Sequence, residues 1–481
     1  MSVVPLTVPS DASDDDAVVD AIIARARNAQ RRFEADATQE RYDRAAVAAA
    51  WALMEPDRNR ALAEMAVRTT GLGNVEDKVV KNHRKTLGLL RDMKGVPTCG
   101  IVEHDAATGI TTIARPRGVV GAVVPSTNPV ATPVNNVVNA LKTGNAIILS
   151  PSPKGAEVCE RLLGHIHAEF DKLGGLIAEI GRDLVQMVPA PVTKAKAQRL
   201  MERADWLVVT GSQNNVRRAM TSGTPASAVG AGNVTTIVDE TADLADAAAK
   251  ITASKTFDNA TSCSSENNIV VVEAVREAFL DALDRAGGVL LRGGDGAQLK
   301  EALFGGGHLN RHMLAKDLDE VAQVAGLSLP DHARFLVIEG DGIGPDHPES
   351  GEKLSLVATF YVARDFDHAA EIAGRLLDHV GAGHSVGVHT TEADRPERLG
   401  LTLPTCRVIV NQAHCFATGG AFDNGMPFSL SMGCGSWGGN AIDDNVNFRH
   451  LMNLTKVVRT IPAREPSLDD IFADHWATAG R

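Results

Sequence analysis

Residues 14–70 carry apolar side chains at the spacing of amphipathic helices. The segments DDDAVVDAIIARARNAQRRF and RAAVAAAWALMEP are rich in Ala, Arg and Glu, and their apolar positions recur every three or four residues. This pattern predicts paired amphipathic helices. The next patterned segment, IVEHDAATGITTIARPRG at residues 101–118, has alternating β-branched residues around Ala-Thr-Gly. It predicts a β-hairpin in the form of an extended arm.

From residue 119 onward, short apolar runs alternate with helical stretches. The runs VVGAVVPSTNP, NAIILSP and ADWLVVTGS each end at Pro, Gly, Ser or Thr, and helical patterns such as 154–180 and 193–203 lie between them. This alternation is typical of a doubly wound parallel sheet. Ligands of such sheets bind beyond the carboxyl ends of the strands. We therefore expect the residues that follow the three runs to converge on one crevice: Ser126 to Asn128, Ser150 to Lys154 and Thr210 to Ser212.

The same alternation resumes after residue 235. TTIVDE, a helical pattern at 241–256 and NNIVVVE are followed by further strand and helix patterns up to about residue 415, and they predict a second α/β domain. The chain from residue 436 has a Gly-rich stretch, one helical piece and a Pro-containing end. We expect it to wrap on a neighbouring subunit.

Composition limits the partners of the chain. Its 481 residues include 60 acidic and 48 basic ones, and the formal charge of −12 is spread along the chain, whereas a nucleic-acid-binding surface needs a basic stripe. No apolar run approaches the ~18 residues of a membrane-spanning helix. The N-terminus, MSVVPLTVPSDASDDDAVVD, lacks the basic and apolar regions of a secretory signal. We therefore expect neither a nucleic-acid partner nor a membrane association.

The cysteines indicate a reducing compartment. They are too few and too scattered for a disulfide framework, and no pair has the spacing of a zinc site. We expect a cytoplasmic protein without a bound metal. The six cysteines stand at positions 99, 159, 263, 406, 415 and 434.

One cysteine, Cys263, lies in an unusual setting. It belongs to KTFDNATSCSSENNIVV, where a helical pattern ends in a cluster of Ser, Thr and Asn directly before a β-branched strand. A buried structural cysteine usually lies in an apolar face. Local composition leaves a structural thiol and a reactive thiol open, because reactivity depends on an electropositive environment that the sequence does not show.

Four segments together resemble the coenzyme A-acylating branch of the aldehyde dehydrogenase superfamily. They are VPSTNPVATP, KTGNAIILSPSPKG, FDNATSCSSENNIVV and LSMGCGSWGGNAIDDNV, in this order over nearly the whole chain. The resemblance implies an α/β fold of the aldehyde dehydrogenase type, with two doubly wound domains and an arm. The implied division is a dinucleotide-binding domain at 1–100 and 119–234, a catalytic domain at 235–439, and an oligomerisation arm at 101–118 and 440–481.

The resemblance also implies the chemistry. Cys263 would form a thioester with the oxidised aldehyde, and coenzyme A would then take the acyl group. Asn128 and the backbone N–H of Cys263 would stabilise the oxyanion; without the resemblance, Asn128 is more simply a turn residue before Pro129. The segment NQAHCFATGGAFDNGMPFSLSMGCGSWGGN resembles members of this branch that act on sulfoacetaldehyde. Succinate semialdehyde and short-chain aldehydes are the alternative substrates.

The resemblance places a nicotinamide cofactor in the predicted crevice, although no GxGxxG fingerprint is present. No carboxylate follows the strand NAIILSP to bind a ribose 2′-hydroxyl, and Lys154 can neutralise a 2′-phosphate, so NADP is favoured over NAD. Glu352, in GEKLS, matches the position that binds the nicotinamide ribose, with a solvated loop glutamate as the alternative. The other implied cofactor residues are Ser150, Pro151, Ser152, Thr210, Gly211 and Ser212.

A missing carboxylate determines the expected fate of the thioester. Hydrolytic aldehyde dehydrogenases carry a general-base glutamate in a Glu-Leu-Gly-Gly segment, but the corresponding TPASAVGAGN, residues 224–233, contains neither Asp nor Glu. We therefore expect transfer to coenzyme A rather than to water. His384, in GAGHS, either assists a proton transfer or has a structural or positioning role, and Cys434 is interpreted as a packing residue.

Alternatives remain at this point. If the resemblance does not hold, the chain is a hydrolytic dehydrogenase or a non-catalytic binding relative that keeps the dinucleotide site. Retention of Cys263, Asn128 and Glu352 argues against the non-catalytic relative. An anionic substrate would need a cation in the pocket, and none of Arg407, His414 and Arg449 is assigned to it. We expect a homodimer or a homotetramer.

Overall fold

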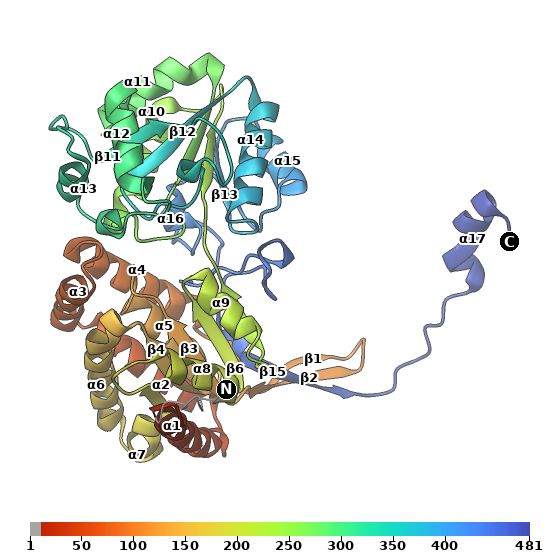
Figure 1. Ribbon diagram of the computed structural model, residues 1–481. Helices are drawn as coiled ribbons and strands as arrows, with labels where there is room; N and C mark the ends of the chain where they lie inside the picture. The colour runs from red at the N-terminus through yellow and green to blue at the C-terminus, as the bar shows by residue number, and fades with distance from the viewer. Residues whose placement is uncertain (1–10) are drawn as a thin grey trace, which may run out of the picture.

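The computed structural model describes residues 11–481. Residues 1–10, which begin the predicted segment 1–100 and the predicted non-secretory N-terminus, lie outside the described residues. Two α/β lobes lie one above the other, and an arm projects from the lower one (Figure 1). Among the described residues, no helix is both long and apolar enough to cross a bilayer.

The lower lobe contains a five-stranded parallel sheet in the order β5-β4-β3-β6-β7. Every residue of β3 and β4 is buried because helices cover both faces, as expected for a parallel sheet. The strands are β3 (Val119–Val124), β4 (Ala146–Pro151), β5 (Val185–Met187), β6 (Trp206–Thr210) and β7 (Ala226–Val229); the helices between them are α5 (Ala131–Lys142), α6 (Ala156–Leu173), α7 (Gly175–Leu184), α8 (Lys194–Arg203) and α9 (Gln213–Met220).

Four N-terminal helices pack on this lobe: α1 (Asp11–Glu34), α2 (Gln39–Met54), α3 (Pro56–Thr70) and α4 (Val75–Met93). The prediction of amphipathic helices over 14–70 is confirmed by the first three. The sequence pattern did not indicate α4. An amphipathic helix normally buries an apolar stripe, but the buried face of α4 contains Lys78, Lys81 and Lys85.

The upper lobe contains a seven-stranded parallel sheet in the order β10-β11-β12-β9-β8-β13-β14, which confirms the second α/β domain. Its strands are β8 (Thr235–Val238), β9 (Asn268–Val272), β10 (Gly288–Leu291), β11 (Phe335–Glu339), β12 (Val357–Ala363), β13 (Val386–His389) and β14 (Val408–Val410). Its helices are α10 (Leu244–Thr256), α11 (Arg276–Ala286), α12 (Gly293–Phe304), α13 (Leu318–Ala325), α14 (Phe366–His379), α15 (Arg395–Thr402) and the short α16 (His414–Ala417).

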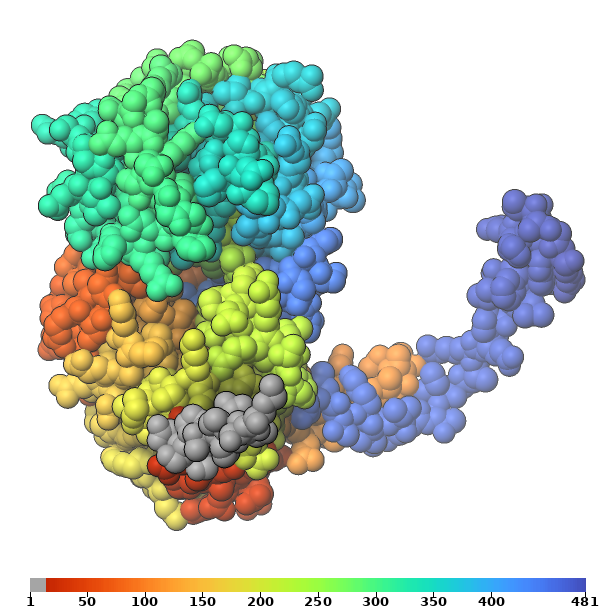
Figure 2. All heavy atoms as spheres, viewed as in Figure 1, coloured from red at the N-terminus to blue at the C-terminus, as the bar shows by residue number. Residues whose placement is uncertain are grey.

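After the upper lobe the chain returns to the lower one, where Phe428, Val446, Phe448 and Leu451 join its apolar core. The arm follows. β1 (Gly100–Asp105) and β2 (Ile110–Pro116) form the predicted antiparallel hairpin, and β15 (Met452–Val458) pairs with β2 as the third strand. The last helix, α17 (Leu468–Ala479), stands well away from both lobes (Figure 2).

Candidate active site

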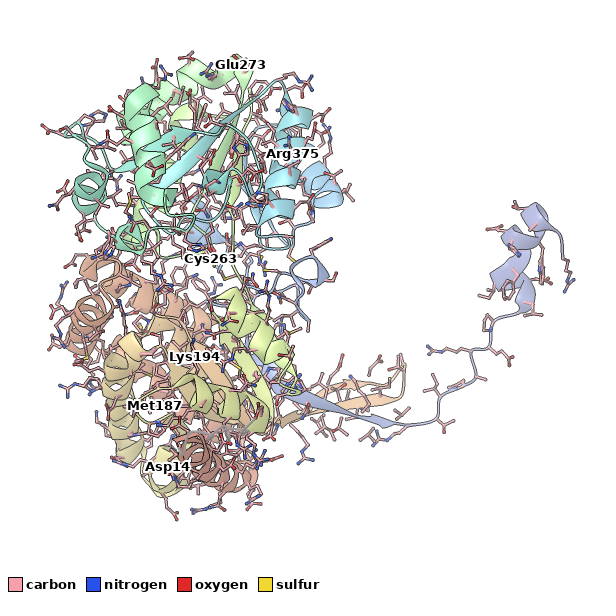
Figure 3. The ribbon with its side chains drawn as sticks, in the orientation of Figure 1. Asp14, Met187, Lys194, Cys263, Glu273 and Arg375 are labelled. Carbon is pink, nitrogen blue, oxygen red and sulfur yellow. The ribbon has the colours of Figure 1, made fainter. Side chains whose placement is uncertain are left out.

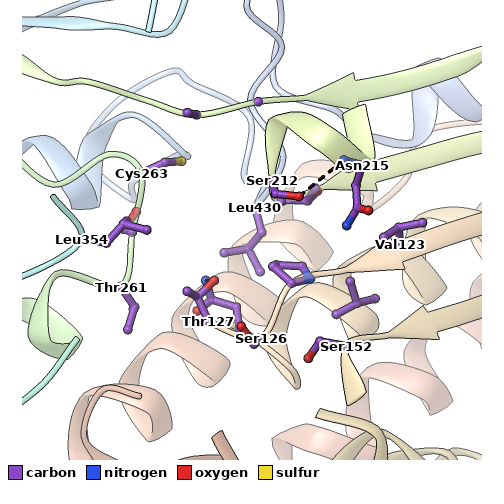
Figure 4. A pocket seen from close by; sticks show the side chains of 18 of the residues that line it. Val123, Ser126, Thr127, Ser152, Ser212, Asn215, Thr261, Cys263, Leu354 and Leu430 are labelled. Carbon is purple, nitrogen blue, oxygen red and sulfur yellow. Dashed lines mark hydrogen bonds between the residues drawn. The ribbon is translucent and has the colours of Figure 1, made fainter. Parts of the chain in front are cut away.

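Cys263 lies at the junction of the two lobes (Figure 3). It belongs to the loop between a 3-10 turn, η2 (Phe257–Ala260), and strand β9. This loop borders a cavity of about 660 Å³ that extends across the carboxyl ends of β3, β4 and β6. Figure 4 shows Cys263 beside this cavity, with Ser126, Ser152 and Ser212 farther along it.

The cavity collects most of the residues singled out in the sequence. Lys154 is not among the lining residues: its exposed side chain follows Ser152 in a short turn. Arg407, His414 and Arg449 do not line the cavity either. Those that do are Asn128, Ser150, Pro151, Ser152, Thr210, Gly211, Ser212, Cys263 and Glu352.

The turn before Cys263 has an unusual backbone. Asp258, Asn259 and Ala260 all have positive φ, at 48°, 53° and 59°, a region that non-glycine residues adopt only when their surroundings impose it. The start of α4 does so: the Asp258 N–H donates to Asp77 Oδ2 at 2.7 Å, and Asp258 Oδ1 accepts from the Asn74 N–H at 3.0 Å. The position of the Cys263 loop therefore depends on α4.

Two buried lysines of α4 share the Asp258 carboxylate. Lys78 Nζ lies 3.0 Å and Lys81 Nζ 2.5 Å from Asp258 Oδ2. The pKa of Asp258 is held below its usual range by both lysines, against burial, which acts in the opposite direction as the largest single influence. Burial lowers the pKa of Lys78 to about 8. The three side chains form one buried ionic cluster that joins the lower lobe to the upper one.

Lys81 also fixes the orientation of Asn128. Its ammonium donates to Asn128 Oδ1 at 3.0 Å and to Thr261 Oγ1 at 2.9 Å, in addition to Asp258. An ammonium group can only donate, so the Asn128 atom that it contacts must be the carbonyl oxygen. The amide nitrogen is then left for another acceptor; its nearest protein contact, Thr127 Oγ1, lies at 3.5 Å.

Behind Cys263, a row of hydrogen-bonding side chains leads into the upper lobe. His384 Nε2 lies 3.3 Å from Cys263 Sγ, His384 Nδ1 lies 2.7 Å from Ser385 Oγ, and Ser385 Oγ lies 2.9 Å from His414 Nε2. If Ser385 donates to His414, His384 carries its proton on Nδ1 and presents a lone pair to the thiol. Arg407 supports this row by donating to the His384 carbonyl at 2.9 Å.

Burial keeps the thiol and the imidazole neutral. It raises the pKa of Cys263 to about 12, with a smaller contribution from the negative charge of Glu352. It lowers the pKa of His384 to about 3, and the Arg407 guanidinium acts in the same direction. The resting pair is therefore a thiol beside a neutral base, rather than a thiolate beside an imidazolium.

The segment 224–233 lies against the same thiol. Gly230 and Ala231 line the cavity, and a Cβ on Gly232 would come within 2.4 Å of the Cys263 carbonyl oxygen and 3.0 Å of His384 Nε2. The glycine therefore allows His384 to approach. The nearest acid in the cavity wall is Glu352, whose Oε1 accepts from the Gly232 N–H at 3.3 Å and whose pKa is raised by burial to about 7.

The end of the cavity at the strands β4 and β6 carries hydroxyl groups and two cations that the sequence did not single out. Lys194 and Arg218 both line it, and Arg218 donates to the Lys194 carbonyl at 2.7 Å. They lie on α8 and α9, away from any motif, so only the folded structure brings them beside Ser152 and Ser212.

The opposite end, beside Cys263, is walled by α4. Lys81, Arg84 and Lys85 line it together with Phe257 and several small or apolar residues: Cys415, Gly419, Leu430 and Met432. This wall was not predicted from the sequence. Its only sequence signal is the spacing of Lys78, Lys81 and Lys85, three and then four residues apart, which places three cations on one face of a helix.

Comparison with known proteins places the chain in a family. The aldehyde dehydrogenase family model matches residues 7–320. The sulfoacetaldehyde dehydrogenase (acylating) of Cupriavidus necator is 54% identical, over 96% of this chain and 93% of that protein. The succinate-semialdehyde dehydrogenase (acetylating) of Clostridium kluyveri is 33% identical, over 94% and 98%.

A solved structure agrees with these relatives. The acetylating aldehyde dehydrogenase of Geobacillus thermoglucosidasius has a TM-score of 0.89 at 32% identity, and the match covers 96% of this chain and 100% of that one. The resemblance inferred from the four sequence segments is thereby confirmed. The chain, with its thiol at the junction of two parallel-sheet lobes, belongs to the aldehyde dehydrogenase family.

Proposed function

We propose that this protein oxidises sulfoacetaldehyde to its coenzyme A thioester, with NAD(P) as the hydride acceptor. The observation that carries the proposal is the contact of a half-buried thiol, Cys263, with a neutral imidazole, His384, in a cavity to which residues 224–233 contribute no carboxylate. The Cupriavidus necator relative, named for sulfoacetaldehyde and for acylation, supports both the substrate and the acceptor.

In the first step, Cys263 Sγ forms a bond to the aldehyde carbon while its proton moves to His384 Nε2. The carbonyl oxygen becomes an oxyanion, and the Asn128 amide nitrogen and the Cys263 N–H donate to it. Lys81 makes this possible by occupying Asn128 Oδ1, so that the amide presents its donor side. Preorganised donors of this kind each contribute about 10²- to 10³-fold in rate.

In the second step, the oxyanion re-forms the carbonyl and a hydride leaves the same carbon, which gives a thioester on Cys263. When bound, the nicotinamide cofactor supplies the hydride acceptor. The cavity fits such a cofactor: it runs from Cys263 to the hydroxyl groups of Ser152 and Ser212 at the strand ends. Glu352 also lines this cavity, and its carboxylate can accept from a ribose hydroxyl.

In the third step, the thiol of coenzyme A attacks the thioester carbonyl and gives its proton to His384, which must first have released the proton taken from Cys263. The low pKa of His384, about 3 because of burial, favours that release. Cys263 then departs and is reprotonated. Residues 224–233 offer water no carboxylate as a general base, because Gly230, Ala231 and Gly232 lie in the segment that corresponds to the Glu-Leu-Gly-Gly of hydrolytic aldehyde dehydrogenases.

We infer a preference for NADP over NAD. No carboxylate is present among Ser150, Pro151 and Ser152 to bind a ribose 2′-hydroxyl. Lys194 and Arg218 line the end of the cavity where these three residues lie. The exposed Lys154 follows Ser152 in the sequence. A 2′-phosphate would be neutralised by these cations, whereas the uncharged ribose of NAD would leave them without a partner.

We also infer that the arm binds a second copy of the chain, as a dimer or a tetramer. It projects from the lobes (Figure 2) and exposes apolar side chains that a monomer would leave in water. The six cysteines are all free, in keeping with a cytoplasmic protein. The exposed large apolar residues of the arm are Ile101, Leu454, Val457, Val458, Leu468, Ile471 and Phe472.

The decisive experiment omits coenzyme A. Enzyme mixed with sulfoacetaldehyde and NADP should release one reduced cofactor per site and stop, and addition of coenzyme A should start steady turnover. Cys263→Ala should give neither phase. Steady turnover without coenzyme A would instead identify a hydrolytic dehydrogenase, and cofactor binding without any reduction would identify a non-catalytic relative.

A panel of aldehydes tests the substrate. Sulfoacetaldehyde, succinate semialdehyde, acetaldehyde and propionaldehyde are compared with coenzyme A and either NAD or NADP. A higher kcat/KM for an uncharged short aldehyde would overturn the sulfonate assignment and leave the acylating chemistry intact. A higher kcat/KM with NAD would overturn the cofactor preference alone.

A further inference from the structure

The α4 wall of the cavity contains two adjacent cations that have no role in the three catalytic steps proposed above. Arg84 and Lys85 both line the cavity that holds Cys263. They lie one turn beyond Lys81 on the same helix. Their environment differs from that of Lys81, because no carboxylate of residues 14–481 lies within 4 Å of either of them.

Lys85 is a nearly buried ammonium group, with 7% of its surface exposed. It donates to the Gly419 carbonyl at 2.6 Å, and its charge lies 5.6 Å from the centre of the Phe428 ring. An ammonium group has three donors, and the structure gives only one of them a protein acceptor. The charge itself is left without an opposite one.

Arg84 is half-buried and has a similar shortage of partners. Its Nη2 donates to the Phe416 carbonyl at 3.2 Å, and its guanidinium lies over the Phe416 ring at 4.9 Å. Burial lowers the pKa of Arg84, and the smaller opposing influences come from Cys415 and then from Asp423. Four of the five N–H donors of Arg84 have no protein acceptor within hydrogen-bond distance.

Two neighbouring, poorly solvated cations are unfavourable unless an anion joins them. The positive charge of Arg84 contributes to the low pKa of Lys85, although burial is the larger cause. Charge on Cys263 acts on Lys85 in the opposite direction, so the ammonium lies within electrostatic range of the reacting sulfur. An anion held by these two side chains would therefore lie beside the thiol.

We propose that Arg84 and Lys85 form a subsite for the anionic tail of the aldehyde, the sulfonate of sulfoacetaldehyde. This inference rests on the proposed function. A sulfonate offers three acceptor oxygens, so it can take two bonds from the Arg84 guanidinium and one from the Lys85 ammonium. Its aldehyde carbon, two bonds from the sulfur, then faces Cys263. A carboxylate tail, as in succinate semialdehyde, presents the same chemistry on a longer chain.

The test measures a ratio of specificities in the full-length enzyme. For Arg84→Gln and for Lys85→Met, kcat/KM for sulfoacetaldehyde divided by kcat/KM for propionaldehyde should fall about 10- to 100-fold, the effect of losing one charged hydrogen bond. Arg84→Lys should recover part of the loss. Arg60→Gln is the matched control, because it removes one positive charge from an exposed ion pair with Glu76 and should leave the ratio within twofold.

A second measurement is independent of sulfoacetaldehyde turnover. Ethanesulfonate should inhibit propionaldehyde oxidation competitively with the aldehyde, and at least 10-fold more weakly in Arg84→Gln. Equal inhibition of wild type and variant would overturn the subsite. Because Arg84 is only half-buried, this variant should fold even if Lys85→Met does not; melting temperatures check both.

The outcomes separate the subsite from the function. If the wild type prefers sulfoacetaldehyde and neither variant changes the ratio, the subsite is wrong and the function stands. If the wild type does not use sulfoacetaldehyde but ethanesulfonate inhibits through Arg84, the subsite stands and the substrate is wrong. A larger loss for succinate semialdehyde than for sulfoacetaldehyde would assign the subsite to carboxylates.

Discussion

Helix α4 presents two pairs of cations to the interior, and the pairs differ in one respect. Lys78 and Lys81 share the carboxylate of Asp258, whereas the direct partners of Arg84 and Lys85, one turn farther along, are backbone carbonyls and aromatic rings. The first pair is complete, so it holds the Cys263 loop and Asn128 in place. The second pair lacks an anion.

The difference teaches how burial can be used in two ways on one helix. A buried charge that has its counter-ion stabilises a particular arrangement, and losing the counter-ion is costly. A buried charge without a counter-ion is a cost that a ligand can relieve. The same residue type is structural in one turn of α4 and suited to recognition in the next.

The largest expected effect comes from removing the carboxylate that Lys78 and Lys81 share. Asp258→Asn leaves Lys78 and Lys81 as buried cations without a carboxylate, and we expect the free energy of unfolding to fall by about 3–5 kcal/mol, as for other broken buried ion pairs. Urea denaturation measures it. The control is Asp367→Asn, in an exposed pair with Arg398, which should cost less than ~1 kcal/mol. Equal losses of unfolding free energy in the two variants would show that the Asp258 cluster stabilises the fold no more than a surface ion pair does.

A smaller effect is expected from Lys81→Met, which frees the Asn128 amide to turn. We expect kcat/KM to fall by about 10²-fold for charged and uncharged aldehydes alike, because oxyanion stabilisation does not depend on the tail. Combining Lys81→Met with Asn128→Ala should cost little more than Asn128→Ala alone. A loss of kcat/KM confined to sulfoacetaldehyde would indicate that Lys81 binds the anionic tail, and it would contradict the distinction between the Lys78–Lys81 pair and the Arg84–Lys85 pair.

The second pair should respond to pH. Burial lowers the pKa of Lys85 to about 7, and the groups that face it are Arg84 and Lys81, which lower it, and Cys415 and Cys263, which raise it. An anion binds the protonated form, so KM for sulfoacetaldehyde should rise as pH increases above about 7, approaching tenfold per pH unit. KM for propionaldehyde, measured in the same buffers, should not follow this curve. Identical pH profiles for both aldehydes would remove Lys85 from recognition.

The smallest effect is expected from salt. A sulfonate bound by one buried and one half-buried cation is screened less than an exposed ion pair. We therefore expect KM for sulfoacetaldehyde to change less than about threefold between 0.05 and 0.5 M NaCl. A steep, continuous rise of KM with salt would indicate that the tail binds at the surface instead.

The strands and the cavity could be read from local patterns. Val119–Val124 and Ala146–Pro151 are continuous apolar runs because both faces of their sheet are covered, and parallel strands bring the residues after them together. Cys263 stood out for the polar setting of its loop. Each of these features lies within one short stretch of sequence.

The contacts that local patterns do not show join distant parts of the chain. Lys81 and Asn128 are 47 positions apart, and His384 and Cys263 are 121 apart. Nothing in the local sequence of α4 shows that its lysines face Asp258, because a run such as VEDKVVKNHRK is typical of an exposed helix. Likewise, Lys194 and Arg218 both line the end of the cavity at β4 and β6 because α8 and α9 are neighbours, whereas Lys154, favoured from sequence, lies outside the cavity wall.

The buried cluster of Asp258 with Lys78 and Lys81 has a consequence for how these three positions evolve. The acid belongs to the upper lobe and the two lysines to the lower one, more than 170 positions earlier. A recombinant that joined the lower lobe of one relative to the upper lobe of another would keep a competent thiol loop only if both parents carried the matching partners. The three positions should therefore be gained or lost together, even though the two lysines lie 180 and 177 positions before the acid.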